Sequence, residues 1–125
     1  MKPVIALIDD DDDVRDVMGF ALEHEGIESV AFENGKVALD QLLALSPKDY
    51  PCLVIVDYLM PVMDGLTFVQ TIHSDYAASL GKIPMYLSSA IDSFGDDVFI
   101  PPAVKIIGKP VDLDVFLKLA KDHLP

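Results

Sequence analysis

The stretch LVIVD, residues 53–57, is an apolar run of strand length that ends on a carboxylate, Asp57. The turn-forming stretch YLMP follows it at once, at residues 58–61. A short continuous apolar run bounded by turn residues is typical of a strand buried on both faces, as the strands of a parallel sheet are. We therefore predict a buried strand over residues 52–56, with Asp57 at its carboxyl end.

Strand-length apolar runs alternate with helical periodicity along the rest of the chain. We predict further strands over residues 3–9, 28–32, 84–89 and 103–107. Apolar residues at helical spacing predict five helices, which lie roughly between residues 14 and 26, 34 and 46, 64 and 73, 91 and 99, and from 112 onward. This alternation predicts an α/β fold, in which helices cover both faces of a doubly wound parallel sheet.

Length and charge restrict the class of protein. A chain of 125 residues suits a single domain over residues 1–125. The 21 acidic residues against 9 basic ones give a net charge of -12, which argues against direct binding of nucleic acid or of an anionic membrane. A basic protein surface or a divalent cation is the more natural partner. Since no stretch has the pattern of a membrane span or a signal peptide, the expected compartment is the cytosol.

Charged residues follow three of the predicted strands. Asp9 and Asp10 close the first, Asp57 the third and Lys109 the fifth. All strands of a parallel sheet end at the same edge, where ligands bind. Two carboxylates about 4 Å apart repel by about 4 kcal/mol at an effective dielectric constant of about 20, so a cluster of three calls for a compensating cation or for raised pKa values. Oxygen ligands without a nearby histidine favour Mg²⁺, and the lysine adds a phosphate-binding group.

Other polar residues near these strand ends have simpler interpretations. Asp11, Asp12 and Asp13 suit a solvated turn that caps the following helix. Ser88 and Ser89 both end the fourth strand, and the residues alone do not decide which hydroxyl faces the site.

Four ordered motifs resemble the receiver domain of two-component response regulators, over essentially the whole chain. They are LIDDD at 7–11 with Arg15 after it, VDYLMPVMDG at 56–65, SSA at 88–90 and GKP at 108–110. The second motif is highly specific. The resemblance implies a flavodoxin-like (β/α)5 fold with five parallel strands in the order 2-1-3-4-5.

The resemblance also implies a role for each site residue. Asp57 looks like the phosphoacceptor, which takes a phosphoryl group from a phosphohistidine on a sensor histidine kinase or a histidine phosphotransfer protein. Mg²⁺ would be bound directly by Asp10 and Asp57, by Asp9 through water, and by the backbone carbonyl of Leu59. The protein would then be a signalling domain rather than an enzyme, and its output a downstream effector or a self-dimer.

At the ends of the last two strands, the resemblance assigns the remaining phosphoryl contacts. Ser89 matches the switch hydroxyl of the family because Ala90 follows it. Lys109 would neutralise another phosphoryl oxygen, and the Lys109–Pro110 peptide would be cis.

The chain departs from the family pattern in three places. Ile106 stands where an aromatic residue is usual, so the usual coupled movement of ring and hydroxyl is in question. The stretch from Ala90 to Lys109 is short and contains two prolines. Leu59, two residues after Asp57, is apolar and cannot hold an attacking water, which suggests a changed lifetime for the phosphorylated form.

Two other functions remain open. The first is a degenerate receiver that acts as a phosphorylation-independent scaffold, which the Ile106 position and the altered fourth helix suggest. The second is a phosphohydrolase of the haloacid-dehalogenase type. The stretch DDDDV at 10–14 loosely fits its nucleophile motif, and GDD at 95–97 loosely fits its late acidic motif. That interpretation leaves the 57–65 stretch unexplained.

Overall fold

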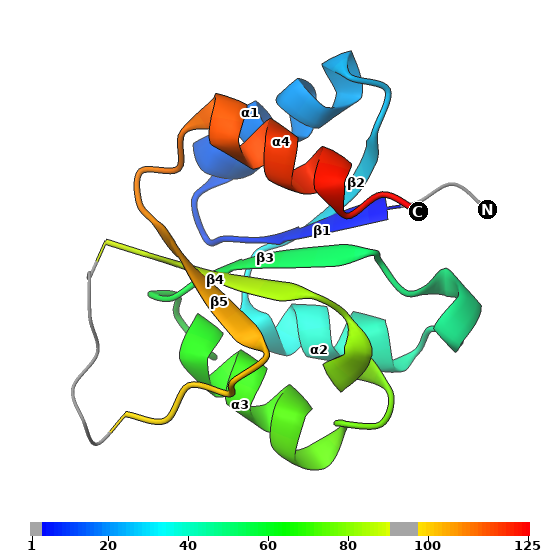
Figure 1. Cartoon of the computed structure of the whole chain (residues 1–125). Coiled ribbons are helices and arrows are strands. Elements are labelled where there is room, and N and C mark those ends of the chain that lie inside the picture. The colour runs from blue at the N-terminus through cyan, green and yellow to red at the C-terminus, as the bar shows by residue number, and fades with distance from the viewer. Residues whose placement is uncertain (1–3, 91–97) are drawn as a thin grey trace.

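A computed structural model describes residues 4–90 and 98–125 of the chain. Within them, five parallel strands form one sheet in the order β2-β1-β3-β4-β5 (Figure 1). The strands are β1 (Val4–Ile8), β2 (Glu28–Phe32), β3 (Leu53–Asp57), β4 (Met85–Ser89) and β5 (Val104–Gly108). Their order confirms the predicted doubly wound fold, and each strand lies within one residue of its predicted limits.

Helices cover both faces of the sheet. The described residues form α1 (Asp12–His24), α2 (Gly35–Leu43), α3 (Gly65–Asp75) and α4 (Leu113–Asp122), with short 3-10 turns η1 (Pro47–Asp49) and η2 (Leu80–Lys82). Figure 1 shows α1 and α4 on one side of the sheet and α2 and α3 on the other. Residues 91–97, which hold most of the fourth predicted helix, lie outside the described part, and residues 98–99 are not helical. No helix of the described chain is both long and apolar enough to cross a membrane.

Each α-helix begins at a polar side chain that accepts hydrogen bonds from the first turn. Asp11 accepts from the amide of Asp13 at 2.9 Å, and Asn34 and Asp64 make equivalent contacts at 2.9 and 2.7 Å. Asp112 caps α4 in the same way, as the sequence predicted. Such a cap satisfies an otherwise unpaired backbone donor, which explains why the polar residues before each periodic run set the helix starts.

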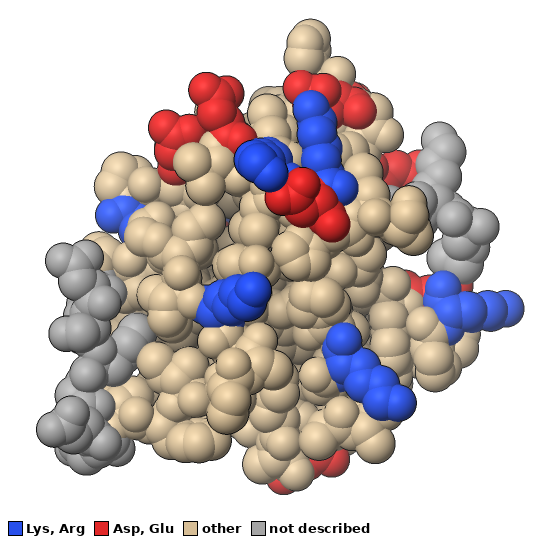
Figure 2. Space-filling model, in the orientation of Figure 1, with Lys and Arg blue, Asp and Glu red and all other residues tan. Residues whose placement is uncertain are grey.

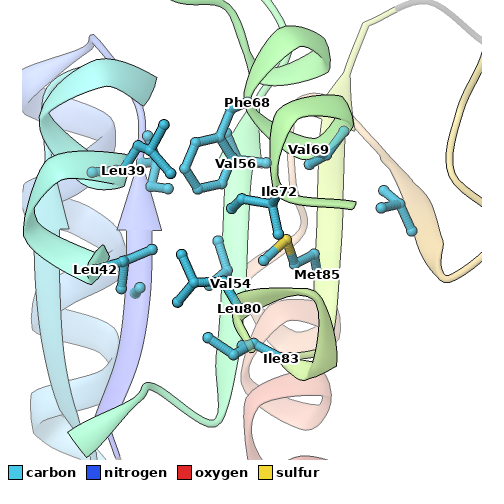
Figure 3. Packing of buried hydrophobic residues seen from close by; sticks show 14 of the residues in the cluster. Leu39, Leu42, Val54, Val56, Phe68, Val69, Ile72, Leu80, Ile83 and Met85 are labelled. Carbon is cyan, nitrogen blue, oxygen red and sulfur yellow. The ribbon is translucent and has the colours of Figure 1, made fainter. Parts of the chain in front are cut away.

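The core consists of two buried clusters, one on each face of the sheet. Successive residues of a strand point to opposite faces. Val54 and Val56 therefore join the cluster with α2 and α3 that Figure 3 shows. Leu53 and Ile55 join the cluster with α1 and α4. The same alternation places Asp57 on the side of α1 and α4.

Ion pairs lie on the surfaces of α1 and α4, within α4 and between the two helices. Lys121 of α4 lies 3.2 Å from Glu25 at the end of α1, and Lys118 pairs with Asp122 at 3.0 Å. Figure 2 shows red and blue side chains next to one another in the upper part of the molecule. Exposed pairs of this kind contribute little, so buried apolar contacts hold these helices in place.

Candidate functional site

Three carboxylates meet at the carboxyl edge of the sheet. Asp57 is the last residue of β3, and Asp9 and Asp10 directly follow the neighbouring strand β1. The amide of Asp9 still donates to Phe32 of β2 at 3.1 Å, which keeps the end of β1 in line with the sheet. One carboxylate oxygen from each of the three aspartates lies within 4.8 Å of the others. This spacing suits a hard cation with oxygen ligands.

Lys109 directly follows β5, the strand beyond β4, and its side chain reaches back to these carboxylates. Its Nζ atom lies 3.0 Å from Asp57 Oδ2 and 3.4 Å from Asp9 Oδ2. Its amide donates to the carbonyl of Ser89 at 2.9 Å, which fixes the start of the side chain beside β4. The Lys109–Pro110 peptide is cis. The structure therefore brings together Asp9, Asp10, Asp57 and Lys109, four residues that the sequence selected for this site.

The three carboxylates differ in their exposure to solvent. Asp9 and Asp57 are each only 6% exposed, whereas Asp10 is exposed. Asp9 Oδ1 accepts a hydrogen bond from the amide of Asp11 at 2.9 Å, while its Oδ2 faces Lys109. Both oxygens of Asp9 thus have partners within the protein.

Burial governs the protonation of Asp57. It raises the pKa of this carboxyl, the hydrogen bond from Lys109 opposes the shift without cancelling it, and the Asp9 and Asp10 carboxylates add to it. Burial alone would lower the pKa of Lys109, but Asp57 and Asp9 hold that pKa above its ordinary value. The site therefore keeps its lysine charged and makes an unneutralised Asp57 carboxylate costly.

Arg15 organises the turn between β1 and α1. Its guanidinium donates to the backbone carbonyl of Asp9 at 2.5 Å and pairs with Asp12. Asp11 is occupied as the cap of α1. Asp11 and Asp12 are thus used by the helix start and the turn, as predicted. The three-carboxylate group includes none of Asp11, Asp12 and Asp13. Residues 95–97, the late motif of the haloacid-dehalogenase interpretation, lie outside the described residues.

Gly65 allows α3 to begin directly beneath the end of β3. A side-chain Cβ atom at this position would lie 2.1 Å from the backbone oxygen of Asp57. The amide of Gly65 donates to the carbonyl of Tyr58 at 2.9 Å, and the amide of Tyr58 donates to Ser88 at 2.8 Å. Glycine at this position therefore lets the turn after Asp57 stay close to the sheet.

The two serines of β4 occupy opposite faces of the sheet. Both are 3% exposed. Ser88 pairs in register with Asp57, and paired residues of parallel strands share a face, as Ile55 and Tyr86 do two pairs earlier. Ser89 follows Leu87 onto the face of α2 and α3. Within the described chain, Ser88 Oγ is buried without a hydrogen-bond partner, a feature that sequence reasoning missed and that strand register could have indicated.

Two of the three departures from the family pattern, Leu59 and Ile106, are exposed side chains. The side chain of Leu59 is 67% exposed in the turn after Asp57. Ile106, in β5, is 40% exposed and pairs in register with Leu87. Neither side chain is held in the core, so each can be changed without disturbing the packing that positions Asp57.

Comparisons with known proteins agree with this fold. A family model for the response regulator receiver domain matches residues 5–121. The NtrC transcriptional regulator of Proteus hauseri is 34% identical over 118 residues, covering 94% of this chain and 24% of that protein. An uncharacterized 14.6 kDa protein of Leptolyngbya boryana is 38% identical over 65 residues, 52% of this chain and 47% of that protein. The chain thus spans about a quarter to a half of these relatives.

Solved structures show the same architecture. The chemotaxis protein CheY4 of Vibrio cholerae superimposes with a TM-score of 0.78, at 22% identity over 99% of this chain and 100% of that chain. A CheY-like receiver domain protein from Methanospirillum hungatei gives a TM-score of 0.79, at 22% identity over 98% and 93% of the two chains. At this identity, the likeness concerns the fold alone.

Proposed function

Because this chain belongs to the family of response regulator receiver domains, we propose that Asp57 is its phosphoacceptor in a two-component phosphorelay. A phosphohistidine on a sensor histidine kinase or a histidine phosphotransfer protein is the proposed donor. A carboxylate oxygen of Asp57 attacks phosphorus in line, an O–P bond forms as the N–P bond breaks, and the product is an acyl phosphate. Transfer of this kind depends mainly on positioning and on neutralised charge.

Mg²⁺ is the proposed cofactor, since the donor set consists of closely spaced carboxylate oxygens. Asp10 and Asp57 would bind the ion directly, with the backbone carbonyl of Leu59 as a further ligand. Asp9 would act through water, because both of its oxygens already have protein partners. Bound there, the ion would offset the negative charge that gathers when a phosphoryl group approaches.

Lys109 and Ser89 complete the proposed site. The Nζ atom of Lys109 lies 3.0 Å from Asp57 and can pass from the carboxylate to a phosphoryl oxygen without a long movement. Ser89, at the end of the adjacent strand, is the proposed donor to another phosphoryl oxygen. Alternation along β4 places Ser89 on the face of the sheet opposite Asp57. The role proposed for Ser89 therefore rests on the family motif and not on strand geometry.

The proposed output is a change in partner binding or self-dimerisation when Asp57 is phosphorylated. A receiver domain is a signalling unit rather than a classical enzyme, and we propose that residues 1–125 act as one such unit. Direct contact with nucleic acid is not proposed, because the net charge is -12 and Figure 2 shows scattered rather than clustered basic side chains on the face drawn. Membrane binding is not proposed either. The proposed compartment is the cytoplasm.

The observation that carries the proposal is the meeting of three carboxylates with the Lys109 ammonium around Asp57. Incubation with Mg²⁺ and acetyl phosphate, followed by intact-mass analysis, tests it directly. We expect one added phosphate on the native protein, none on Asp57→Asn, and an unchanged yield on Asp16→Asn, an exposed acid of α1. If the native protein gains no phosphate, the degenerate scaffold becomes the better interpretation. Phosphomonoester turnover that survives Asp57→Asn would instead support the phosphohydrolase.

A further inference from the structure

A cavity of about 500 Å³ opens beside the acidic site, on the face of the sheet that α1 and α4 cover. Its apolar wall is formed by the sheet, by α1 and by the turn into α4, through residues such as Ile55, Val14, Met18 and Val111. This volume falls within the range of about 300–1,000 Å³ that small-molecule sites occupy. Such sites combine a mainly apolar lining with a few polar groups that orient the ligand.

Ser88 supplies a polar group of this kind. The residue lines the cavity and is 3% exposed, and its hydroxyl has no hydrogen-bond partner among the described residues. Its register partner Asp57 lies on the same face of the sheet, so the side chain is directed toward the cavity rather than toward α3. A buried hydroxyl without a partner is unfavourable, and a guest in the cavity that bonds to it would remove that cost.

The charges around the cavity restrict the class of guest. Asp9, Asp13 and Asp57 contribute carboxylates to the lining. The two cations of the lining are already engaged, Lys109 with Asp57 and Asp9, and Arg15 with Asp12 and the Asp9 carbonyl. In the absence of a bound cation, an anion would meet these carboxylates without a free counter-charge among the lining residues, and a neutral molecule would meet no such penalty.

We propose that this cavity binds a small neutral molecule with an apolar body of one or two rings and a single hydroxyl or carbonyl group. The rings fill the apolar part, and the polar group exchanges a hydrogen bond with Ser88 Oγ. Because Asp57 and Lys109 form part of the same wall, an occupied cavity would bias the arrangement of the acidic site. The proposal goes beyond phosphoryl transfer and does not depend on it.

Two probes of nearly equal shape test the inference. The unphosphorylated protein is titrated with 2-naphthol and with 2-methylnaphthalene, and amide shifts are followed by NMR. We expect saturable shifts from both probes that gather at the first half of α1 and at residues 109–113. The Ser88→Ala substitution should weaken the binding of 2-naphthol about threefold to tenfold, which corresponds to the loss of one neutral hydrogen bond. It should leave the affinity for 2-methylnaphthalene unchanged.

Two substitutions on α1 serve as matched controls. Val17 lines the cavity and is 49% exposed, so Val17→Phe can fill the space without disturbing the core and should weaken both probes. Phe20 is 67% exposed on the same helix but does not line the cavity, so Phe20→Ala should change neither. The spectrum of each variant reports whether it is folded.

Three results would overturn the inference. They are the absence of saturable binding by either probe, an equal effect of Ser88→Ala on both probes, and a loss of binding in Phe20→Ala that marks adhesion to exposed surface. An ordered water as the sole guest would give the first of these results. Acetyl phosphate is absent from the titrations, so failure here leaves the phosphoacceptor proposal untouched, and failure of phosphorylation leaves this one untouched.

Discussion

The two faces of the sheet differ at the carboxyl ends of the strands, although the same strands form both faces. Under α2 and α3, the face is closed by apolar side chains, and Val56 and Leu87 are fully buried there. Under α1 and α4, the next residues along the same strands are Asp57 and Ser88, which border a cavity. Adjacent residues of one strand therefore contribute to the buried core on one face and to the acidic site on the other. Substitutions at the ends of these strands should mainly change stability on the first face and mainly change ligand binding on the second.

The largest expected effect concerns the closed face. Phe68 of α3 is fully buried, so Phe68→Ala should lower the free energy of unfolding by about 3–5 kcal/mol, through lost burial and the space left behind. Phe20 on α1 is 67% exposed, and Phe20→Ala should change that free energy by less than about 0.5 kcal/mol. Urea unfolding measures both. Equal losses for the two variants would show that the burial of Phe68 does not account for its contribution to stability.

The closed face was also the part that the sequence predicted best. Apolar runs such as 53–56 indicate buried strands by composition alone, and a charged residue marks the carboxyl end of the first, third and fifth runs. The strand order was available only from the family resemblance, because apolar runs carry no information about which strands are neighbours. The strand order in the structure confirms the order that the resemblance implied.

The open face was harder to predict because its details depend on contacts distant in sequence. The run of aspartates does not reveal that Asp9 is buried and Asp10 exposed, a difference that follows from the bonds of Arg15 and Lys109 to Asp9. Likewise, two adjacent serines cannot be assigned to faces until the register with β3 is known. The cavity beside Ser88 has no signal in the sequence at all.

Cation binding should give the next largest effect, this time on the open face. If Asp10 and Asp57 hold Mg²⁺, the ion at about one hundred times its Kd should raise the free energy of unfolding by about 2.7 kcal/mol. Asp10→Asn should remove most of this gain, whereas Asp16→Asn on the exposed side of α1 should retain it. Thermal or urea unfolding with and without Mg²⁺ is the measurement. An unchanged gain in Asp10→Asn would exclude it as a ligand.

The turn after Asp57 offers a kinetic test of the same face. Leu59 presents an apolar and mostly exposed side chain two residues from the acceptor, where it cannot orient a water. We expect Leu59→Asn to shorten the lifetime of the phosphorylated protein severalfold, because an amide can hydrogen-bond the attacking water. Loss of the added phosphate is followed by intact mass after removal of the donor. Equal rates in the two proteins would contradict the expectation.

Ser88 gives a smaller effect, of opposite sign to the Phe68 substitution. Removal of a buried hydroxyl that has no partner should leave the free energy of unfolding unchanged or raise it by up to about 1 kcal/mol. Urea unfolding of Ser88→Ala without added ligand measures this. A loss above about 1 kcal/mol would mean that the hydroxyl is bonded in the free protein and that the cavity has no unmet polar group.

The smallest expected effect is the dependence of stability on pH through Asp57. Its pKa is raised in the folded protein, so the folded state binds the proton more tightly than the unfolded chain does, and ionisation of this carboxyl costs stability. The hydrogen bond from Lys109 is already included in that balance. Asp57→Asn should therefore be more stable than the native protein at neutral pH without Mg²⁺. The difference should shrink as pH falls through the folded-state pKa, below which the native carboxyl is protonated as well. Urea unfolding of the native protein and of Asp57→Asn across this range of pH measures the difference. A native protein more stable than Asp57→Asn at neutral pH would mean that Lys109 more than offsets the burial of Asp57, and that the open face is stabilised by its charges rather than held at a cost until a cation binds.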